Sequence, residues 1–265
     1  MGARNGWERP LYFVPEGAPR GDRPTYRRPD WLPYQIAECA AIRERAGVLD
    51  MTSFAKFEVR GPGAAALLDR LSANRLPAVG RAAVSQLLTP AGGIECDLTI
   101  SRIAPDRFYL ITAAGTETHD LAWIASHAPT DGTVVLENVT AAWGVLAIAG
   151  PRSREILAAL SEDDWSNAGF PFMAVRDLHL GPVPVRALRI TYTGELGWEL
   201  HHPIEYTHTL YDLLFEAGAS HGLADVGYRA LDSLRLEKGY RLWGVDISPL
   251  YTPLEAGLER FVRLD

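Results

Sequence analysis

The chain has 265 residues, a formal net charge of −7 at pH 7, and 47% hydrophobic and 22% charged residues. These values are typical of a globular protein long enough to bury a sizeable core. The acidic balance and the lack of clustered lysine and arginine argue against a nucleic-acid partner. No apolar run approaches the roughly 20 residues that span a bilayer, and the N-terminus lacks a signal-peptide core. We therefore expect a cytoplasmic protein without a membrane partner.

Cysteines and histidines give no metal-ligand spacing. Cys39 and Cys96 are far apart and belong to no CxxC pair, which favours a reducing compartment and predicts no structural metal site. His201, His202 and His208 are close in sequence but not at a convincing ligand spacing, so we interpret them as ordinary strand-end or helix residues.

The N-terminal third begins with a segment of little periodicity. Residues 1–33 are rich in proline, glycine, arginine and aromatic residues, which predicts an extended arm lying over the body of the protein or over a partner. Residues from about 34 to 46 have apolar side chains at helical spacing, and Gly47 is a suitable stop. A strand is predicted at residues 55–60.

An internal repeat follows. A strand, a Gly-Pro turn and a helix occupy residues 57–68, and the same order returns roughly ninety residues later at residues 146–157. Proline is well placed near a helix start, and glycine lets the chain turn sharply off the strand. Two copies are too few for a solenoid, so we predict two related α+β halves.

Asp97 is the unusual residue between the two copies. It lies in a strand pattern after a Gly-Gly turn at Gly92 and Gly93, directly before Leu98. An acid in such a strand is disfavoured by propensity and, if buried, by desolvation, so it requires a partner or a use. The structural alternative is an ion pair or a backbone partner, for example with Arg102.

A second motif lies at residues 189–200, where an alternating strand meets a two-glycine turn and a second strand. This pattern predicts a hairpin with Tyr192 and Glu199 on opposite arms, pointing into one shared space with Trp198 beside them. A hydroxyl and a carboxylate in that arrangement suit a flat heterocycle with N–H donors, whereas the alternative is an exposed hairpin with a solvated glutamate. Helices are predicted at about 205–218 and 225–238, the second capped by Asp225 and stopped by Gly239.

Taken together, the segment Gly92–Leu98, the hairpin, the run Arg229–Gly239 and the run Thr252–Leu258 resemble the tetrahydrofolate-binding aminomethyltransferase family, whose founding member is the glycine-cleavage T-protein. The resemblance covers nearly all of residues 35–265. The segments 6–10, 49–57 and 237–241 are more similar to the folate-binding C-terminal half of dimethylglycine and sarcosine dehydrogenases than to a free T-protein. In those enzymes a flavin domain precedes this half.

The resemblance implies an α+β fold in which two related ferredoxin-like halves, about 34–140 and 141–265, surround a central folate cavity. It also implies that the family's C-terminal β-barrel is absent from this chain. No Gly-x-Gly-x-x-Gly loop is present, so we expect that the chain does not oxidise an amine by itself. A flavin-containing partner subunit is therefore a candidate partner, besides a small methyl or aminomethyl donor.

The resemblance also implies roles for individual residues. Asp97 matches the catalytic acid, which handles a proton at the folate nitrogens that capture the one-carbon unit. Glu199 is implied to accept hydrogen bonds from the N–H groups of the pterin ring. The other implied folate-binding residues are Tyr192, Trp198, Arg229 and Arg235.

Three positions depart from the family pattern. Val84 replaces a tyrosine, Ala113 an asparagine and Leu231 an arginine, for which Arg229 and Arg235 are possible substitutes. The leading hypothesis is a tetrahydrofolate-dependent transferase that accepts a one-carbon unit from a methylated amine or aminomethyl donor. The alternatives are a folate-dependent O- or S-demethylase, and a non-catalytic folate-binding subunit or fragment of a larger flavin-linked demethylating enzyme.

Overall fold

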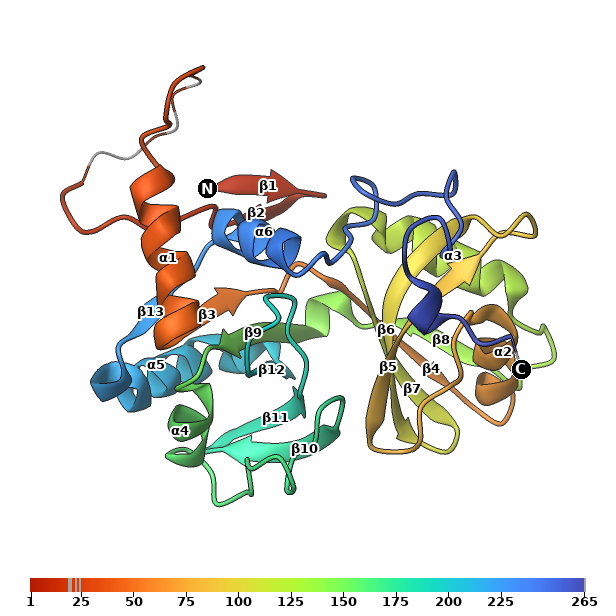
Figure 1. Ribbon diagram of the computed structural model, residues 1–265. Helices are drawn as coiled ribbons and strands as arrows, with labels where there is room; N and C mark the ends of the chain where they lie inside the picture. Colours follow the sequence, from red (N-terminus) through yellow and green to blue (C-terminus); the bar gives the residue numbers. More distant parts are fainter. Residues whose placement is uncertain (19–20, 22, 24, 265) are drawn as a thin grey trace. The chain divides into compact units, whose positions relative to one another are not determined.

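The computed structural model describes residues 1–18, 21, 23 and 25–264, so four residues of the predicted arm lie outside the described residues. The chain forms two compact units (Figure 1). Unit 1 contains Met1–Ser53, Gly144–Phe172 and Asp177–Tyr240, and unit 2 contains Phe54–Trp143, Met173–Arg176 and Arg241–Asp265. The units are interleaved in sequence and therefore differ from the consecutive halves 34–140 and 141–265, because strand β3 (Ala46–Asp50) pairs with strand β9 (Trp143–Ala149).

Unit 1 is built around a six-stranded sheet in the order β10-β11-β12-β9-β3-β13. Strands β13 and β3 are parallel, whereas β11 and β12, and β3 and β9, are antiparallel. The further elements of this unit are β1 (Gly2–Arg4), β2 (Trp7–Arg9), α1 (Leu32–Glu44), α4 (Ser153–Ala158), β10 (Val175–Leu180), β11 (Val183–Leu188), β12 (Gly197–Pro203), α5 (Thr207–Gly218), β13 (Leu223–Asp225) and α6 (Tyr228–Glu237).

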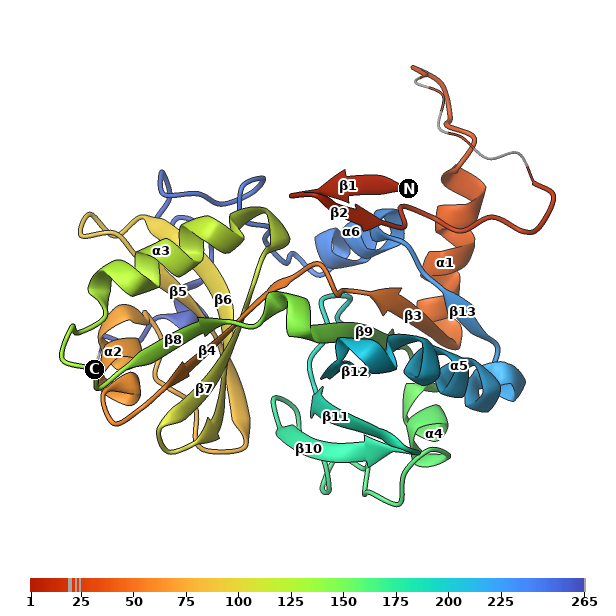
Figure 2. The same ribbon diagram turned by 180° about the vertical axis from the view of Figure 1, so that it is seen from behind.

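Unit 2 is built around an antiparallel five-stranded sheet in the order β5-β6-β7-β4-β8 (Figure 2). Its elements are β4 (Ala55–Arg60), α2 (Ala64–Leu71), β5 (Arg81–Leu88), β6 (Ile94–Ala104), β7 (Arg107–Thr112), α3 (Glu117–His127) and β8 (Val135–Asn138). Short 3-10 turns in the chain lie at Ala114–Thr116, Thr140–Ala142, Ile204–Tyr206, Ala219–His221 and Glu259–Phe261.

Alternation along β6 gives the sheet of unit 2 two different faces. Cys96, Leu98 and Ile100 pack into a hydrophobic core with residues of α2 and α3. Because successive side chains of a strand point to opposite faces, Asp97 lies on the face away from these helices. The folding of an ordinary helix-covered sheet thus fixes the position of the candidate acid.

The predicted repeat is present in the structure as two matching turns. Gly61 follows β4 with φ +113°, and Gly150 follows β9 with φ +124°, a region of backbone conformation that favours glycine. In each copy the carbonyl of the glycine accepts a bond from the start of the next helix, at 2.9 Å from Ala64 N and 3.1 Å from Ser153 N. The two copies thus share their local geometry but belong to different units.

Several predicted elements shift or change. The first predicted helix begins earlier, at Leu32, and ends at Glu44. Asp225 is not a helix cap, and that prediction is wrong: it ends β13 and accepts a bond of 3.0 Å from the hydroxyl of Tyr211, while Gly227 is the N-cap of α6. Gly239 ends that helix as predicted, with φ +70°.

The start of the chain is more ordered than an extended arm. Strands β1 and β2 form a hairpin, and the next residues lie over the start of α6, where Pro10 and Leu11 accept backbone bonds from Tyr228 and Arg229. Across the described residues, no helix combines the length and the apolar character needed to cross a membrane.

Candidate functional site

Asp97 lies on β6, directly opposite Gln86 of β5 in the antiparallel pair. The Gln86 side-chain nitrogen Nε2 donates to Asp97 Oδ1 at 2.8 Å. The arginine considered as its partner is engaged elsewhere, since Arg102 donates to the carbonyl of Pro105 at 2.8 Å. The partner of the candidate acid is therefore a neutral amide, which does not hold the carboxyl in its ionised form as strongly as a guanidinium does.

The pKa of Asp97 is raised to about 6, mainly by burial. This net value includes the hydrogen bond from Gln86, which lowers the pKa, and the smaller effect of the charge of Asp120, which raises it. A carboxyl with this pKa can both hold and release a proton close to neutral pH, as general acid–base chemistry requires. Titration near 6 is also the kind of perturbation that concentrates at functional sites.

Two polar atoms on the Asp97 side of the sheet lack partners. Gln86 is 1% exposed and Ser101 is fully buried, yet Gln86 Oε1 and Ser101 Oγ make no hydrogen bond to any of the described residues. An unpaired buried polar group costs about 1–3 kcal/mol. Gln86 Oε1 is therefore an unpaired buried acceptor next to the acid, whereas Ser101 lies four residues farther along β6.

Glu199 lies on β12 in the other unit. It is 8% exposed and pairs across the sheet with Leu188, while the fully buried His201 on the same face places Nε2 3.2 Å from its Oε2. The predicted hairpin is therefore wrong in one respect: its first strand ends at Leu188, and Tyr192 lies in the loop 189–196 rather than on a strand opposite Glu199. Positive φ at Gly194 and the ion pair Lys238–Glu195 at 3.1 Å shape that loop.

The loop brings Tyr192 to an aromatic residue that sequence reasoning did not select. The rings of Tyr192 and Tyr240 are stacked with centroids 5.9 Å apart. The carbonyl of Tyr240 accepts a bond of 3.0 Å from Arg235, which is itself buried and paired with Asp232. Tyr240 was visible as the residue that follows the helix stop Gly239, but nothing in the spacing indicated that the two rings meet.

The remaining two predicted residues lie apart from this stack. Trp198 is fully buried, and its ring packs against Trp165 and Phe170 at 5.3 and 6.1 Å between centroids. Alternation along β12 places it on the face opposite Glu199. Arg229 is half-buried with its guanidinium 3.8 Å from the centre of the Trp31 ring.

A group with metal-ligand chemistry lies on the helix-covered side of unit 2. Ligand atoms of Cys96, His119 and Asp120 lie within 4.8 Å of one another. Both ring nitrogens of His119 are engaged, Nδ1 with Asp120 and Nε2 with Glu95, each at 2.8 Å. Partial burial lowers the pKa of His119, but the two carboxylates outweigh this effect and the pKa is raised overall. Burial raises the pKa of the Cys96 thiol. These residues form a hydrogen-bonded network that favours a protonated imidazole at His119 and a neutral thiol at Cys96.

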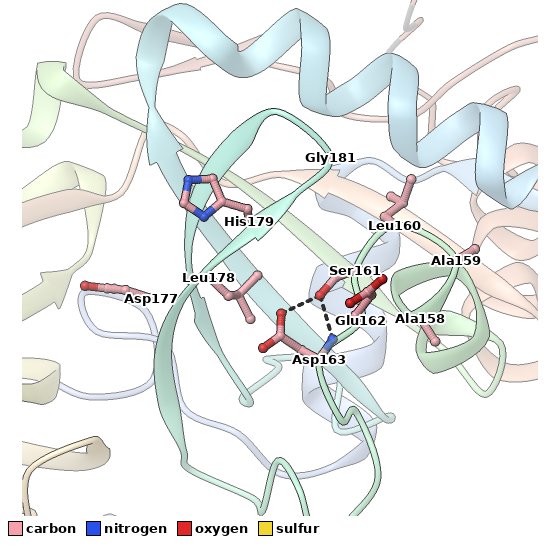
Figure 3. A pocket seen from close by; sticks show the side chains of 10 residues that line it. All are labelled: Ala158, Ala159, Leu160, Ser161, Glu162, Asp163, Asp177, Leu178, His179 and Gly181. Atoms are coloured by element: carbon pink, nitrogen blue, oxygen red, sulfur yellow. Dashed lines mark hydrogen bonds between the residues drawn. The ribbon is translucent and has the colours of Figure 1, made fainter.

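A cavity of about 650 Å³ opens on unit 1 between the segment after α4 and the β10–β11 hairpin (Figure 3). It is lined by Ser161, Glu162, Asp163, Asp177 and His179 together with small and aliphatic residues. Ser161 and Asp163 bond to each other through the serine hydroxyl. None of the predicted site residues lines this cavity, so it does not mark the predicted folate site.

Comparison with known proteins agrees with these features. The family described as "GCVT N-terminal domain" matches residues 1–265. The chain is 42% identical to mouse dimethylglycine dehydrogenase, mitochondrial, over 100% of this chain and 31% of the relative. It is 35% identical to the mouse regulatory subunit of pyruvate dehydrogenase phosphatase, over 99% of this chain and 31% of the relative.

A solved structure shows the same fold. The glycine cleavage system aminomethyltransferase T of Bartonella henselae superimposes with a TM-score of 0.82 at 29% identity, covering 99% of this chain and 65% of that one. The chain therefore belongs to the aminomethyltransferase family of the glycine-cleavage T-protein, and the predicted family and α+β fold are confirmed. It spans about a third of the length of the dehydrogenase relatives that it matches.

Proposed function

We propose that the chain is a tetrahydrofolate-dependent one-carbon transferase that accepts the unit from a methylated amine or aminomethyl donor. The observation that carries the proposal is Asp97, a half-buried acid whose pKa is raised to about 6 and whose carboxyl is bonded to the amide of Gln86, in a chain of the aminomethyltransferase family. Tetrahydrofolate, when bound, would supply the nitrogen atoms that receive the one-carbon unit.

In this proposal Asp97 holds or removes a proton at those nitrogens, and its negative charge favours a cationic one-carbon donor. Either task requires a carboxyl group, because an amide neither titrates nor carries charge. Because Asp97 lies on β6, a strand with a paired neighbour on each side, rather than on a loop, its oxygens are kept in place for the transfer.

Glu199 would accept N–H donors of the pterin, since a carboxylate offers two adjacent acceptor oxygens and His201 contacts only one of them in the bond given above. Tyr192, stacked on Tyr240, would offer a ring face to the flat heterocycle. Arg235 would act through Tyr240 by holding its backbone. Trp198 would support the strand that carries Glu199, and Arg229 would meet the charged tail of a folate.

Two further assignments depend on the relatives. Because a dimethylglycine dehydrogenase contains this region as 31% of its length, we propose that a flavin-containing partner supplies the oxidised donor. Likeness to a phosphatase regulatory subunit favours a second candidate function, in which the chain binds folate without catalysing transfer.

The test measures binding and chemistry separately. Anaerobic calorimetry follows tetrahydrofolate binding, and the absorbance of the methylene product follows the condensation of formaldehyde with tetrahydrofolate. We expect the protein to bind tetrahydrofolate and to accelerate the condensation. Asp97→Asn should keep binding within about threefold and lose about 10²- to 10⁴-fold in the accelerated rate.

The outcomes distinguish the candidates. Absence of heat at saturating tetrahydrofolate would overturn both folate functions. Binding without any acceleration by the unsubstituted chain would support the non-catalytic candidate. An Asp97→Asn protein that accelerates as well as the parent would contradict the proposed role of Asp97 while leaving folate binding intact.

A further inference from the structure

Gln86 and Asp97 form a cross-strand pair whose geometry is set by the sheet. They are directly opposite each other on β5 and β6, so both side chains point to the same face. The amide nitrogen of Gln86 lies 2.8 Å from Asp97 Oδ1, and Gln86 is 1% exposed. Neither residue belongs to a loop, and the bond therefore persists without a ligand to organise it.

The rest of strand β5 makes a glutamine at this position unexpected. The same face carries Val84 two residues earlier, where the opposite strand has Thr99. Gln86 is polar where its neighbour on this face of β5 is apolar, and its Oε1 makes no hydrogen bond to the described residues. A buried amide with one unsatisfied oxygen destabilises the fold relative to an aliphatic side chain, so a reason other than folding is needed for its presence.

We propose that Gln86 is the positioning residue of Asp97 and determines which of its two oxygens carries the proton. An amide N–H can donate only to an oxygen that accepts, and in a protonated carboxyl the carbonyl oxygen is the better acceptor. With Nε2 fixed on Oδ1, the proton is held on Oδ2 and is exchanged from Oδ2 with the acceptor nitrogen. No electrons are transferred, and the only bonds changed in that exchange are Oδ2–H and N–H.

The same bond affects when the proton leaves. Hydrogen bonding to the ionised form stabilises it, so Gln86 opposes the rise in pKa that burial and Asp120, from helix α3, impose on Asp97. Without the donor, Asp97 would remain protonated to a higher pH. The inference rests on the proposed role of Asp97 in transfer, but the coupling between the two side chains can be measured without folate.

The experiment replaces Gln86 by methionine, which has a similar volume and no N–H donor. The pKa of Asp97 is measured by carbon NMR of the labelled carboxyl in the free protein, with Asp97→Asn used to assign the signal. We expect Gln86→Met to raise that pKa by about one unit. Leu88→Met, on the same strand but outside the pair, is the matched control and should leave it unchanged.

The pH profile of formaldehyde condensation provides the second readout. In Gln86→Met the limb of the pH–rate profile that is assigned to Asp97 should move to higher pH by the same amount. The Kd for tetrahydrofolate should change less than about threefold. In the Asp97→Asn background the same substitution should have no further effect on the rate, because a residue that acts only through Asp97 has nothing left to position.

The results separate two failures. An unchanged pKa of Asp97 in a folded Gln86→Met protein would overturn the proposal, and so would additive loss in the double variant. If the parent neither binds tetrahydrofolate nor accelerates the condensation, the proposed function fails. A raised pKa of Asp97 in Gln86→Met would then still show that Gln86 and Asp97 are coupled, but without a role in transfer.

Discussion

Each of the two sheets contains a candidate acid, and the two acids have different hydrogen-bond partners. Asp97, on the five-stranded sheet, is bonded to the neutral amide of Gln86, whereas Glu199, on the six-stranded sheet, is bonded to the imidazole of His201. Both acids sit on strands and both units contain a copy of the same strand–turn–helix repeat. The difference teaches that the neighbouring side chain, more than the backbone, decides the use of a carboxyl on a strand. The neutral amide of Gln86 leaves Asp97 with a raised pKa, and the imidazole of His201 can donate a hydrogen bond to the carboxylate of Glu199.

Among the substitutions of these acids and their partners, replacing Glu199 is expected to have the largest effect on tetrahydrofolate binding. If its carboxylate accepts N–H groups of tetrahydrofolate, Glu199→Ala removes charge-assisted bonds of about 2–3 kcal/mol and weakens binding about 30- to 150-fold. Calorimetric titration of the variant measures this loss. Glu199→Gln, which keeps one acceptor, should lose less. Equal affinity in all three proteins would remove Glu199 from the folate site.

Asp97 should reveal its burial as a cost to stability. Its pKa is about 6 in the folded chain against 3.8 for the ordinary group, so the folded state binds the proton more tightly. The free energy of unfolding therefore falls as pH rises from about 4 to 6, by up to about 3 kcal/mol, and stays lower above that range. Asp97→Asn should remove this penalty and stabilise the chain by up to about 3 kcal/mol at pH 7.5, with little gain at pH 4.

Urea unfolding at the two pH values measures this difference. Asp163→Asn, at an exposed loop residue, is the control and should show no such pH-dependent gain. An equal gain for Asp97→Asn at both pH values would indicate improved packing instead of relief from desolvation.

The sequence predicted local structure better than it predicted side-chain partners. The Gly-Pro repeat, the Gly-Gly hairpin and the stop at Gly239 follow from backbone chemistry that only certain residues allow, and all three are present. The end of β11 at Leu188 was missed because the alternation of residues 189–193 continues the strand pattern into a loop. Local periodicity does not contain the pairing that ends a strand.

The same difference between local structure and side-chain partners holds for the residues of the candidate site. Asp97 was identifiable because an acid conflicts with its strand pattern, a conflict that is legible in one segment of sequence. Its partner Gln86 was not, since an amide eleven residues earlier is unremarkable until the register of β5 and β6 is known. Tyr240 and His201 were missed for the same reason, as each becomes informative only through a ring stack or a buried contact.

The smallest expected effect tests the other half of the comparison, the imidazole beside Glu199. His201→Phe fills the buried position but removes the donor 3.2 Å from Oε2, which should free the carboxylate to rotate and weaken tetrahydrofolate binding about fivefold, equivalent to about 1 kcal/mol. His201→Gln restores a donor and should recover most of the affinity. If both variants weaken binding equally while their unfolding curves match, His201 serves packing alone. Recovery by glutamine would show that Glu199 depends on a buried hydrogen-bond donor for its orientation, as we propose for Asp97 and Gln86.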